Sequence, residues 1–235
     1  MDTPYYFGGY YLLRPKTIDF GSDKGIITQT TSACINDALV DTWVYSWSIP
    51  NKQMLEQVKK DFKLDDISIT RIQAWADKTF ELGKLQWVNN FSDLETALEF
   101  KHTFLTHLSN VHIYSVYLSA TDTEALIKEF TNDQHNHGDF GLRQNLLLRI
   151  KEKENSNEVL LGYDLIGVEI GGTYHSFYCN DATQDLIVKF QLSLNENGLF
   201  NNMEDWMEIR EYLNDEKNGF EPVPWYVLKT KLVSE

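Results

Sequence analysis

The alternation of apolar and polar residues predicts strands at both ends of the chain and in its middle. Residues 4–13 are rich in aromatic side chains and are interrupted by Gly8-Gly9, a pattern that indicates a strand with a bulge. Residues 39–49 alternate large aromatic side chains with small ones and give the clearest strand pattern of the chain. Further strands are predicted at residues 111–118 and 223–232, and a weaker one at residues 25–31.

A tight hairpin is predicted around Gly171-Gly172, because strand patterns at residues 159–170 and 173–179 flank the two glycines. A two-residue turn would place His175 opposite Val168. In that register His175 and Cys179 lie on one face, about 13 Å apart at ~3.3 Å per strand residue, which is too far for proton transfer. We therefore expect His175 to line the core and Cys179 to be a small buried residue.

Apolar residues at helical spacing predict the helices that separate these strands. Ser92 with Glu95, and Thr121 with Glu124, match the capping-box pattern, in which the Ser or Thr side chain caps the helix that follows. The predicted helices cover residues 50–63, 67–82, 92–108, 121–130, 181–190 and 202–216. The second of these also fits an alternating strand, and residues 142–150 stay open between helix and strand.

The order of these elements predicts the α+β class, with helices packed on a mainly antiparallel sheet. We expect a single domain over residues 1–235. The charged turn at residues 151–158 is the one place where the chain could divide into two subdomains.

The composition indicates the class of protein. Of its 235 residues, 42% are hydrophobic and 24% charged, which is typical of a globular chain. No apolar run approaches the ~20 residues of a membrane helix, no signal peptide is recognisable, and Cys34 and Cys179 are too few for a disulfide framework. We expect a cytoplasmic protein with free thiols and no membrane partner. Phosphate-binding and catalytic-serine motifs are also missing, so we expect no cofactor.

The net charge of the chain says most about its class of partner. The chain holds 35 Asp and Glu against 21 Lys and Arg, a net charge of −14, which argues against nucleic acid and favours a basic protein partner. In the predicted 202–216 helix, one face is apolar (Met203, Trp206, Met207, Leu213) and another is an acidic stripe (Glu204, Glu208, Glu211, Asp215). The stripe indicates either a surface for a cation-rich partner or simply a solvated helix face.

A histidine-rich loop is a candidate metal site. His135-Asn136-His137-Gly138-Asp139 resembles the first half of the His-x-His-x-Asp-His motif of metallo-β-lactamases, but Phe140 stands where the last histidine belongs. Two histidines and an aspartate can bind a divalent ion weakly. We favour a polar surface loop without metal, and keep a metal-dependent hydrolase using His135, His137 and Asp139 as the alternative.

Six short segments carry a family resemblance: Trp47-Ser48-Ile49-Pro50, Trp87-Val88-Asn89-Asn90-Phe91, Leu161-Gly162-Tyr163-Asp164, His175-Ser176-Phe177-Tyr178-Cys179-Asn180, Asn197-Gly198-Leu199 and Glu221-Pro222-Val223-Pro224-Trp225. Together they resemble a group of bacterial proteins that are similar to the immunity proteins of polymorphic toxins. Such immunity proteins are small, acidic and non-catalytic, and they bind a toxin domain, often a basic nuclease, and block its active site. The resemblance implies this role here.

We therefore expect an acidic protein-binding inhibitor that occludes the active or substrate-binding surface of a basic toxin. Glu204, Glu208, Glu211 and Asp215 would form its docking surface. Tyr174 and Trp225 are candidate aromatic anchors, because interface hot spots favour Tyr and Trp, although either could equally be core. A phage or mobile-element inhibitor of a host defence protein is a second binder of the same kind.

Overall fold

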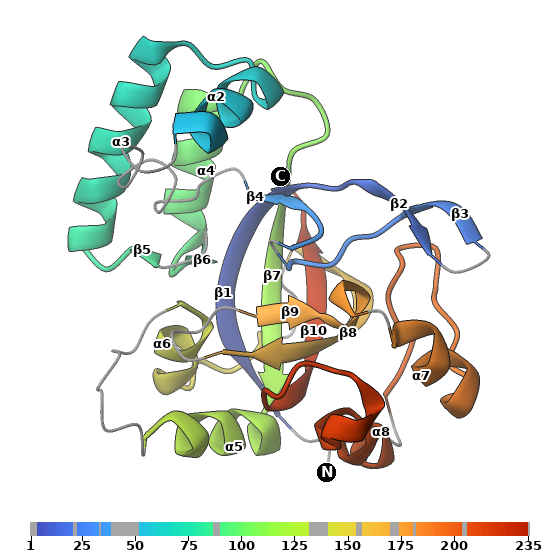
Figure 1. The fold of residues 1–235 in the computed structure, drawn as a ribbon. Helices are drawn as coiled ribbons and strands as arrows, with labels where there is room; N and C mark the ends of the chain where they lie inside the picture. Colours follow the sequence, from blue (N-terminus) through green and yellow to red (C-terminus); the bar gives the residue numbers. More distant parts are fainter. Residues whose placement is uncertain are drawn as a thin grey trace.

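The computed structural model describes residues 4–20, 23–32, 34–38, 52–86, 90–131, 141–153, 157–169, 174–180, 182–203 and 206–234. An antiparallel sheet runs through the middle of these residues (Figure 1). Its strands follow the order β5 (Leu85–Gln86), β6 (Asn90–Phe91), β1 (Tyr5–Arg14), β7 (His112–Ser119), β10 (Trp225–Val233), β8 (Glu158–Val168) and β9 (Tyr174–Ser176). A short strand, β4 (Asp37–Ala38), also pairs with β1, and β2 (Thr17–Phe20) pairs with β3 (Asp23–Ile27) apart from the main sheet.

Helices cover this sheet in three groups (Figure 1). The groups are α2 (Lys52–Asp61), α3 (Asp66–Glu81) and α4 (Leu94–Phe104); α5 (Ala120–Thr131) and α6 (Gly141–Leu147); and α7 (Thr183–Phe190) and α8 (Trp206–Asn214). Each group buries its own apolar cluster against the strands. Every pairing between described strands is antiparallel, so the predicted α+β class is confirmed.

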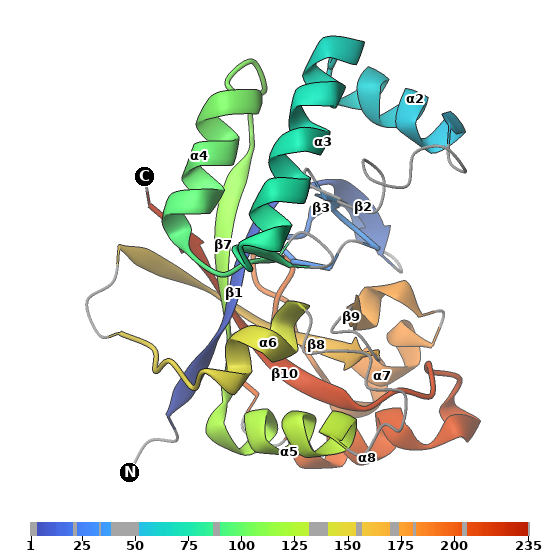
Figure 2. The same cartoon turned by 90° about the vertical axis from the view of Figure 1, so that its left-hand side faces the viewer.

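In the first group of helices, α3 and α4 pack against β5, β6 and β1, at one edge of the sheet (Figure 2). Trp75 of α3 and Phe100 of α4 pack there with ring centroids 5.0 Å apart, and Ile72 and Ile113 are fully buried beside them. The ambiguous segment at residues 67–82 is therefore a helix, as favoured. It begins at its Asp65 cap, whose side chain accepts from the Ser68 N–H.

Gly8-Gly9 forms the predicted bulge in β1. The pairing with β7 shifts between Phe7 and Gly9, and Gly9 has φ +128°, a conformation that favours glycine. A Cβ at Gly9 would lie 2.1 Å from the Asn90 side chain, which hydrogen-bonds across to the Gly8 carbonyl. The two glycines therefore serve both backbone conformation and close packing.

Several local expectations are wrong by one or more residues. Asp93, rather than Ser92, caps α4 by accepting from the Thr96 N–H, and α5 begins at Ala120, where Ser119 accepts from the Asp122 N–H. In both cases the capping residue is the last one before the helical turn, which a four-residue motif does not locate. Helix α8 is described over Trp206–Asn214 and ends two residues before the expected residue 216, and Met207, expected inside, is 57% exposed.

The predicted hairpin is present, but its register differs by one residue. His175 pairs with Gly167, and Tyr174 with Val168, so that residues 169–173 connect the strands. A one-residue shift exchanges the two faces of a strand, and Tyr174 and Ser176 are therefore the buried residues of β9. The strand also ends early, because Phe177–Cys179 forms a 3₁₀ turn.

Some expectations lie outside the described residues: the whole 39–49 strand, the Pro50 helix start and the loop at residues 132–140. The weak strand at residues 25–31 ends at Ile27, while residues 142–150 begin as helix α6. In the described part of the chain, helices are too short or too polar to cross a membrane.

Candidate functional site

Cys34 and His175 lie 141 residues apart in sequence, yet the Cys34 Sγ is 2.9 Å from the His175 Nδ1. The other ring nitrogen of His175, Nε2, is 2.8 Å from a carboxylate oxygen of Glu169 and 3.6 Å from one of Glu221. Cys34 is exposed and His175 is partly buried. A thiol, an imidazole and a carboxylate thus form one continuous line.

Cys179 belongs to the same cluster. Its Sγ, the Cys34 Sγ and a ring nitrogen of His175 all lie within 4.8 Å of one another. The expected separation of about 13 Å between His175 and Cys179 assumed an extended strand at ~3.3 Å per residue. That assumption is wrong, because the 3₁₀ turn at Phe177–Cys179 folds Cys179 back toward His175.

The segment that carries Cys34 is rich in hydroxyl groups, which fix it to the sheet. We call residues 28–32 and 34–36 the Cys34 loop. Within it, the backbone N–H of Cys34 donates to the Ser32 Oγ at 3.3 Å, and the N–H groups of Ile35 and Asn36 donate to the Ser32 carbonyl at 3.2 and 3.1 Å. These bonds close a tight turn that presents the thiol.

Asp164 of β8 connects this loop to the strand that carries His175. Its carboxylate accepts hydrogen bonds from Thr30 of the Cys34 loop and, at 2.9 Å, from Ser176 of β9. All three side chains are fully buried. One buried carboxylate therefore connects the loop that carries the Cys34 thiol to the strand that carries the His175 imidazole.

Two further contacts hold the loop from either side. The Tyr174 hydroxyl lies 2.6 Å from the Thr31 Oγ1, and Ser32 donates to the Tyr174 carbonyl at 3.3 Å. On the far side, the Asn36 side chain donates to the carbonyls of Thr28 and Thr30 at 2.9 and 2.6 Å. The loop is thus ordered by hydrogen bonds, with little apolar packing of its own.

The electrostatics of the cluster favour a charged thiol. A hydrogen bond from Cys179, helped by one from Ser32 and by the charge of His175, lowers the pKa of Cys34 to about 5, against the opposing effect of burial. The same bond to Cys34, together with burial, raises the pKa of Cys179. Burial opposes the charge on His175, but the hydrogen bond to Glu169 and the adjacent Cys34 outweigh it and raise the pKa of His175.

Two unsatisfied polar atoms border the cluster. The Asn180 Nδ2 and the Glu221 Oε2 are buried and have no hydrogen-bond partner among the described residues, while the Asn180 Oδ1 accepts from the Glu221 backbone N–H at 3.3 Å. Glu221 Oε2 is the atom that faces His175 at 3.6 Å. A buried acceptor without a hydrogen bond thus lies beside the histidine, and Asn180, whose Nδ2 is also unpaired, is bonded to the backbone of the same glutamate.

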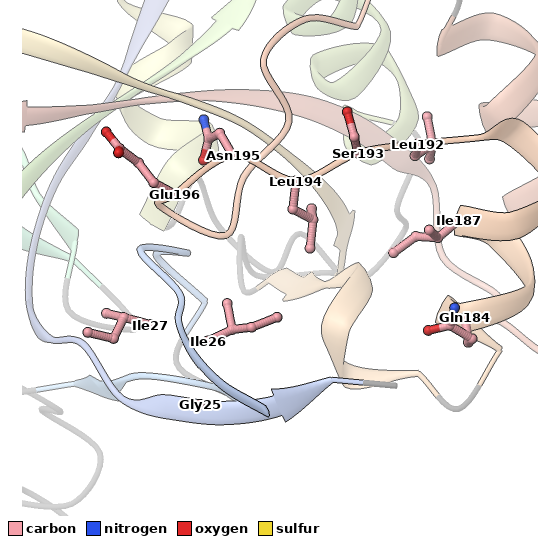
Figure 3. Close-up of a pocket in the computed structure, with 10 residues that line it drawn as sticks. All are labelled: Gly25, Ile26, Ile27, Gln184, Ile187, Leu192, Ser193, Leu194, Asn195 and Glu196. Carbon is pink, nitrogen blue, oxygen red and sulfur yellow. The ribbon is translucent and has the colours of Figure 1, made fainter. Parts of the chain in front are cut away.

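An apolar pocket of about 630 Å³ is formed by the segments that continue from this cluster (Figure 3). Ile26 and Ile27 precede the Cys34 loop, and Ile187 lies on α7, the helix after Cys179. Leu192 and Leu194 complete its apolar lining.

The two predicted aromatic anchors are core residues, which was their alternative interpretation. Tyr174 is 4% exposed and supports the Cys34 loop, while Trp225 is fully buried and donates from its indole to the Glu221 carbonyl at 3.2 Å. Neither presents a face to a partner in this conformation.

Three of the four predicted acidic residues lie among the described residues. Glu208 and Glu211 are exposed on α8, and Asp215 is exposed beyond its end, where it caps the turn Glu216–Asn218. Glu204 and the three candidate metal ligands His135, His137 and Asp139 lie outside the described residues.

Sequence reasoning did not bring Cys34 to His175, and it placed His175 and Cys179 too far apart. The available signal was the run Thr28, Thr30, Thr31, Ser32 ahead of a cysteine, together with an aspartate in the middle of an apolar strand. Hydroxyl groups and a carboxylate at positions that become buried must satisfy one another.

Comparison of the chain with protein-family models, with curated proteins and with solved structures yields no match.

Proposed function

We propose that the protein is a thiol-dependent acyl-transfer enzyme, a hydrolase or transferase, with Cys34 as its nucleophile. One observation carries this proposal: the Cys34 Sγ is 2.9 Å from the His175 Nδ1, and the opposite nitrogen of that ring is 2.8 Å from Glu169. A nucleophile, a base and a carboxylate that orients the base are the parts that covalent acyl transfer needs.

In this proposal the Cys34 thiolate attacks the carbonyl carbon of an ester, thioester or amide. A thioester with Cys34 forms, the bond to the leaving group breaks, and the proton on His175 Nδ1 passes to the leaving group. In the second step, water or another acyl acceptor attacks the thioester while His175 takes a proton from it. The acyl group is released on that acceptor, and Cys34 returns to the free thiolate. Glu169 holds the ring orientation and stabilises its positive charge. Asn180, with its buried unpaired Nδ2, is the side-chain donor we assign to the developing oxyanion.

A simple acyl donor tests the proposal. After treatment with p-nitrophenyl acetate, the wild-type chain should gain one acetyl group, located on Cys34 by peptide mass spectrometry, with a burst of nitrophenolate. Cys34→Ser and His175→Ala should lose the burst. Glu208→Gln, an exposed acid on α8, is the control and should keep the burst. Acetylation of surface lysines alone, or equal acetylation in His175→Ala, would refute the proposal.

A protein-binding inhibitor, as the resemblance to immunity proteins implies, is the second function we propose. It is favoured by the net charge of −14 and by the exposure of Glu208, Glu211 and Asp215 at one end of the fold. Such a surface accelerates encounter with a basic toxin and makes binding salt-dependent. An anti-defence inhibitor would use the same surface.

Charge reversal tests this second function. The tagged wild-type chain should retain a basic protein partner at low salt and lose it at high salt, whereas the triple variant Glu208→Lys, Glu211→Lys and Asp215→Lys should retain none. Reversal of Asp77 and Glu81, two exposed acids on α3 away from α8, is the control. A partner that binds the triple variant with unchanged salt dependence would refute the assigned surface.

A further inference from the structure

We propose that Cys34, His175 and Cys179 bind one thiophilic divalent cation, zinc by their chemistry, and that this cation reversibly blocks the nucleophile. The binding site stands on its own geometry. Only the blocking effect rests on the function proposed above.

The donor set selects the cation. Two sulfur atoms and one imidazole nitrogen lie within 4.8 Å of one another, so a small shift of side chains brings all three around a single ion. Zinc prefers thiolate and imidazole ligands, whereas magnesium and calcium prefer oxygen. Three protein ligands leave a fourth coordination position open, as in zinc sites that exchange water.

The second nitrogen of His175 supports this choice. Glu169 lies 2.8 Å from its Nε2, which leaves Nδ1 to face the two cysteines. A carboxylate bonded to the outer nitrogen of a ligating histidine is the usual second-shell arrangement at zinc sites, and it fixes both the tautomer and the ring orientation.

The ligands are also held in place before any ion binds. Asp164 anchors the Cys34 loop through Thr30 and the His175 strand through Ser176. Cys179 follows directly in the 3₁₀ turn that Ser176 begins. Because one buried network positions all three ligands, little conformational entropy is lost when they close on an ion.

An oxygen-based set competes for the same histidine. Glu169, His175 and Glu221 also bring one ligand atom each within 4.8 Å. That set would use the Nε2 and would suit a harder cation, so the two sets predict different metals and different sensitive residues.

Zinc binding would occupy the two groups that the proposed acyl transfer needs, Cys34 and His175. Ligation takes the proton from the Cys179 thiol and, when His175 is protonated, the proton on its Nδ1, and both pass to solvent. The Cys34 sulfur and the His175 Nδ1 then both point at the ion. Nucleophile and base are therefore withdrawn together, and a chelator restores both.

The test uses the full chain, freed of metal by EDTA and returned to chelator-free buffer. Zinc chloride is titrated in competition with a chromogenic chelator, and Cys34 alkylation by iodoacetamide is followed by peptide mass spectrometry. We expect one zinc per chain and at least tenfold slower alkylation of Cys34 when zinc is bound. Cys179→Ser should weaken zinc at least tenfold, while metal-free Cys34 stays alkylatable and zinc no longer protects it.

Cys179→Ala serves where the serine variant does not fold, and Glu208→Gln is the control for zinc held by exposed acids. Binding below one zinc per chain, unchanged affinity in both Cys179 variants, or loss of binding in Glu221→Gln but not in Cys179→Ser would overturn the site. Stoichiometric zinc without acetylation of Cys34 would instead leave the site standing and refute the enzymatic function. Acetylation without zinc binding would do the reverse.

Discussion

Ser176 donates a 2.9 Å hydrogen bond to the buried carboxylate of Asp164, across the pairing of β9 with β8. The second oxygen of the same carboxylate accepts from Thr30, 134 residues away from Asp164. The strand that carries His175 and the loop that carries Cys34 are thereby fixed to one residue of the central sheet. The proposed chemistry depends on this connection, since Cys34 and His175 share no element.

Loss of the Asp164 carboxylate should therefore loosen the site as well as the fold. Asp164→Ala leaves the buried hydroxyl groups of Thr30 and Ser176 without an acceptor, and we expect a loss of about 2–4 kcal/mol in the free energy of unfolding. Asp164→Asn keeps one acceptor and should lose about half as much. Urea denaturation measures both, and alkylation of Cys34 should slow in the alanine variant. Equal stability of the two variants would contradict the role of the hydrogen bonds.

Stability should depend on pH through this carboxyl group. Burial raises the pKa of Asp164 to about 7, although the bonds from Thr30 and Ser176 oppose the shift. Because the folded pKa lies above the unfolded value of about 3.9, the folded chain binds the proton more tightly, and this contribution is lost as pH rises from about 4 to about 7.

The comparison of wild type with Asp164→Asn isolates that contribution. The difference between their free energies of unfolding should fall by on the order of 1–4 kcal/mol between pH 4 and pH 8, with wild type favoured at the acid end. Both chains share every other titrating group, including His175. A difference that does not change with pH would show that Asp164 is ionised throughout.

Glu169 should act on Cys34 only through His175. Glu169→Gln removes the charge that stabilises the imidazolium and so raises the pKa of Cys34; we expect about tenfold slower alkylation of Cys34 below pH 5, little change near neutral pH, and a pH profile shifted to higher pH. Stability should change little, because Glu169 is exposed. Glu208→Gln, an exposed acid on α8, is the control and should leave the profile unchanged.

The β1 bulge can be tested by two glycine substitutions. Gly9→Ala would place a Cβ 2.1 Å from Asn90 at φ +128°, and should lower the free energy of unfolding by about 3 kcal/mol or more. Gly83→Ala also has positive φ, but nothing lies within 4 Å of the added Cβ, so we expect a loss of about 1 kcal/mol. Similar losses at both positions would mean that close packing at the bulge is unimportant.

Residue patterns along the chain predict those elements that depend on local interactions. The strands at residues 111–118 and 223–232, the helix at 67–82 and the Gly8-Gly9 bulge depend on side-chain periodicity and on backbone freedom, and each was predictable. The capping residues of α4 and α5 were not, because a cap depends on which residue leaves the extended conformation first.

The candidate site was not predictable for a related reason. The distance between His175 and Cys179 depends on where β9 ends, and the strand pattern continued past the 3₁₀ turn that ends it. Cys34 joins them only through Thr30, Asp164 and Ser176, which are brought together by long-range pairing. Such a contact cannot be predicted from the spacing of residues along the sequence.

The relative reactivity of the two cysteines in one molecule tests the central claim most directly. Metal-free protein is treated with limiting iodoacetamide at pH 6, and alkylation of Cys34 and Cys179 is quantified by peptide mass spectrometry. We predict that Cys34 reacts at least a hundredfold faster than Cys179, because the hydrogen bond between them lowers the pKa of Cys34 and raises that of Cys179, and that His175→Ala reduces this difference by removing the positive charge beside Cys34. Equal rates in the wild-type chain would contradict Cys34 as an activated nucleophile.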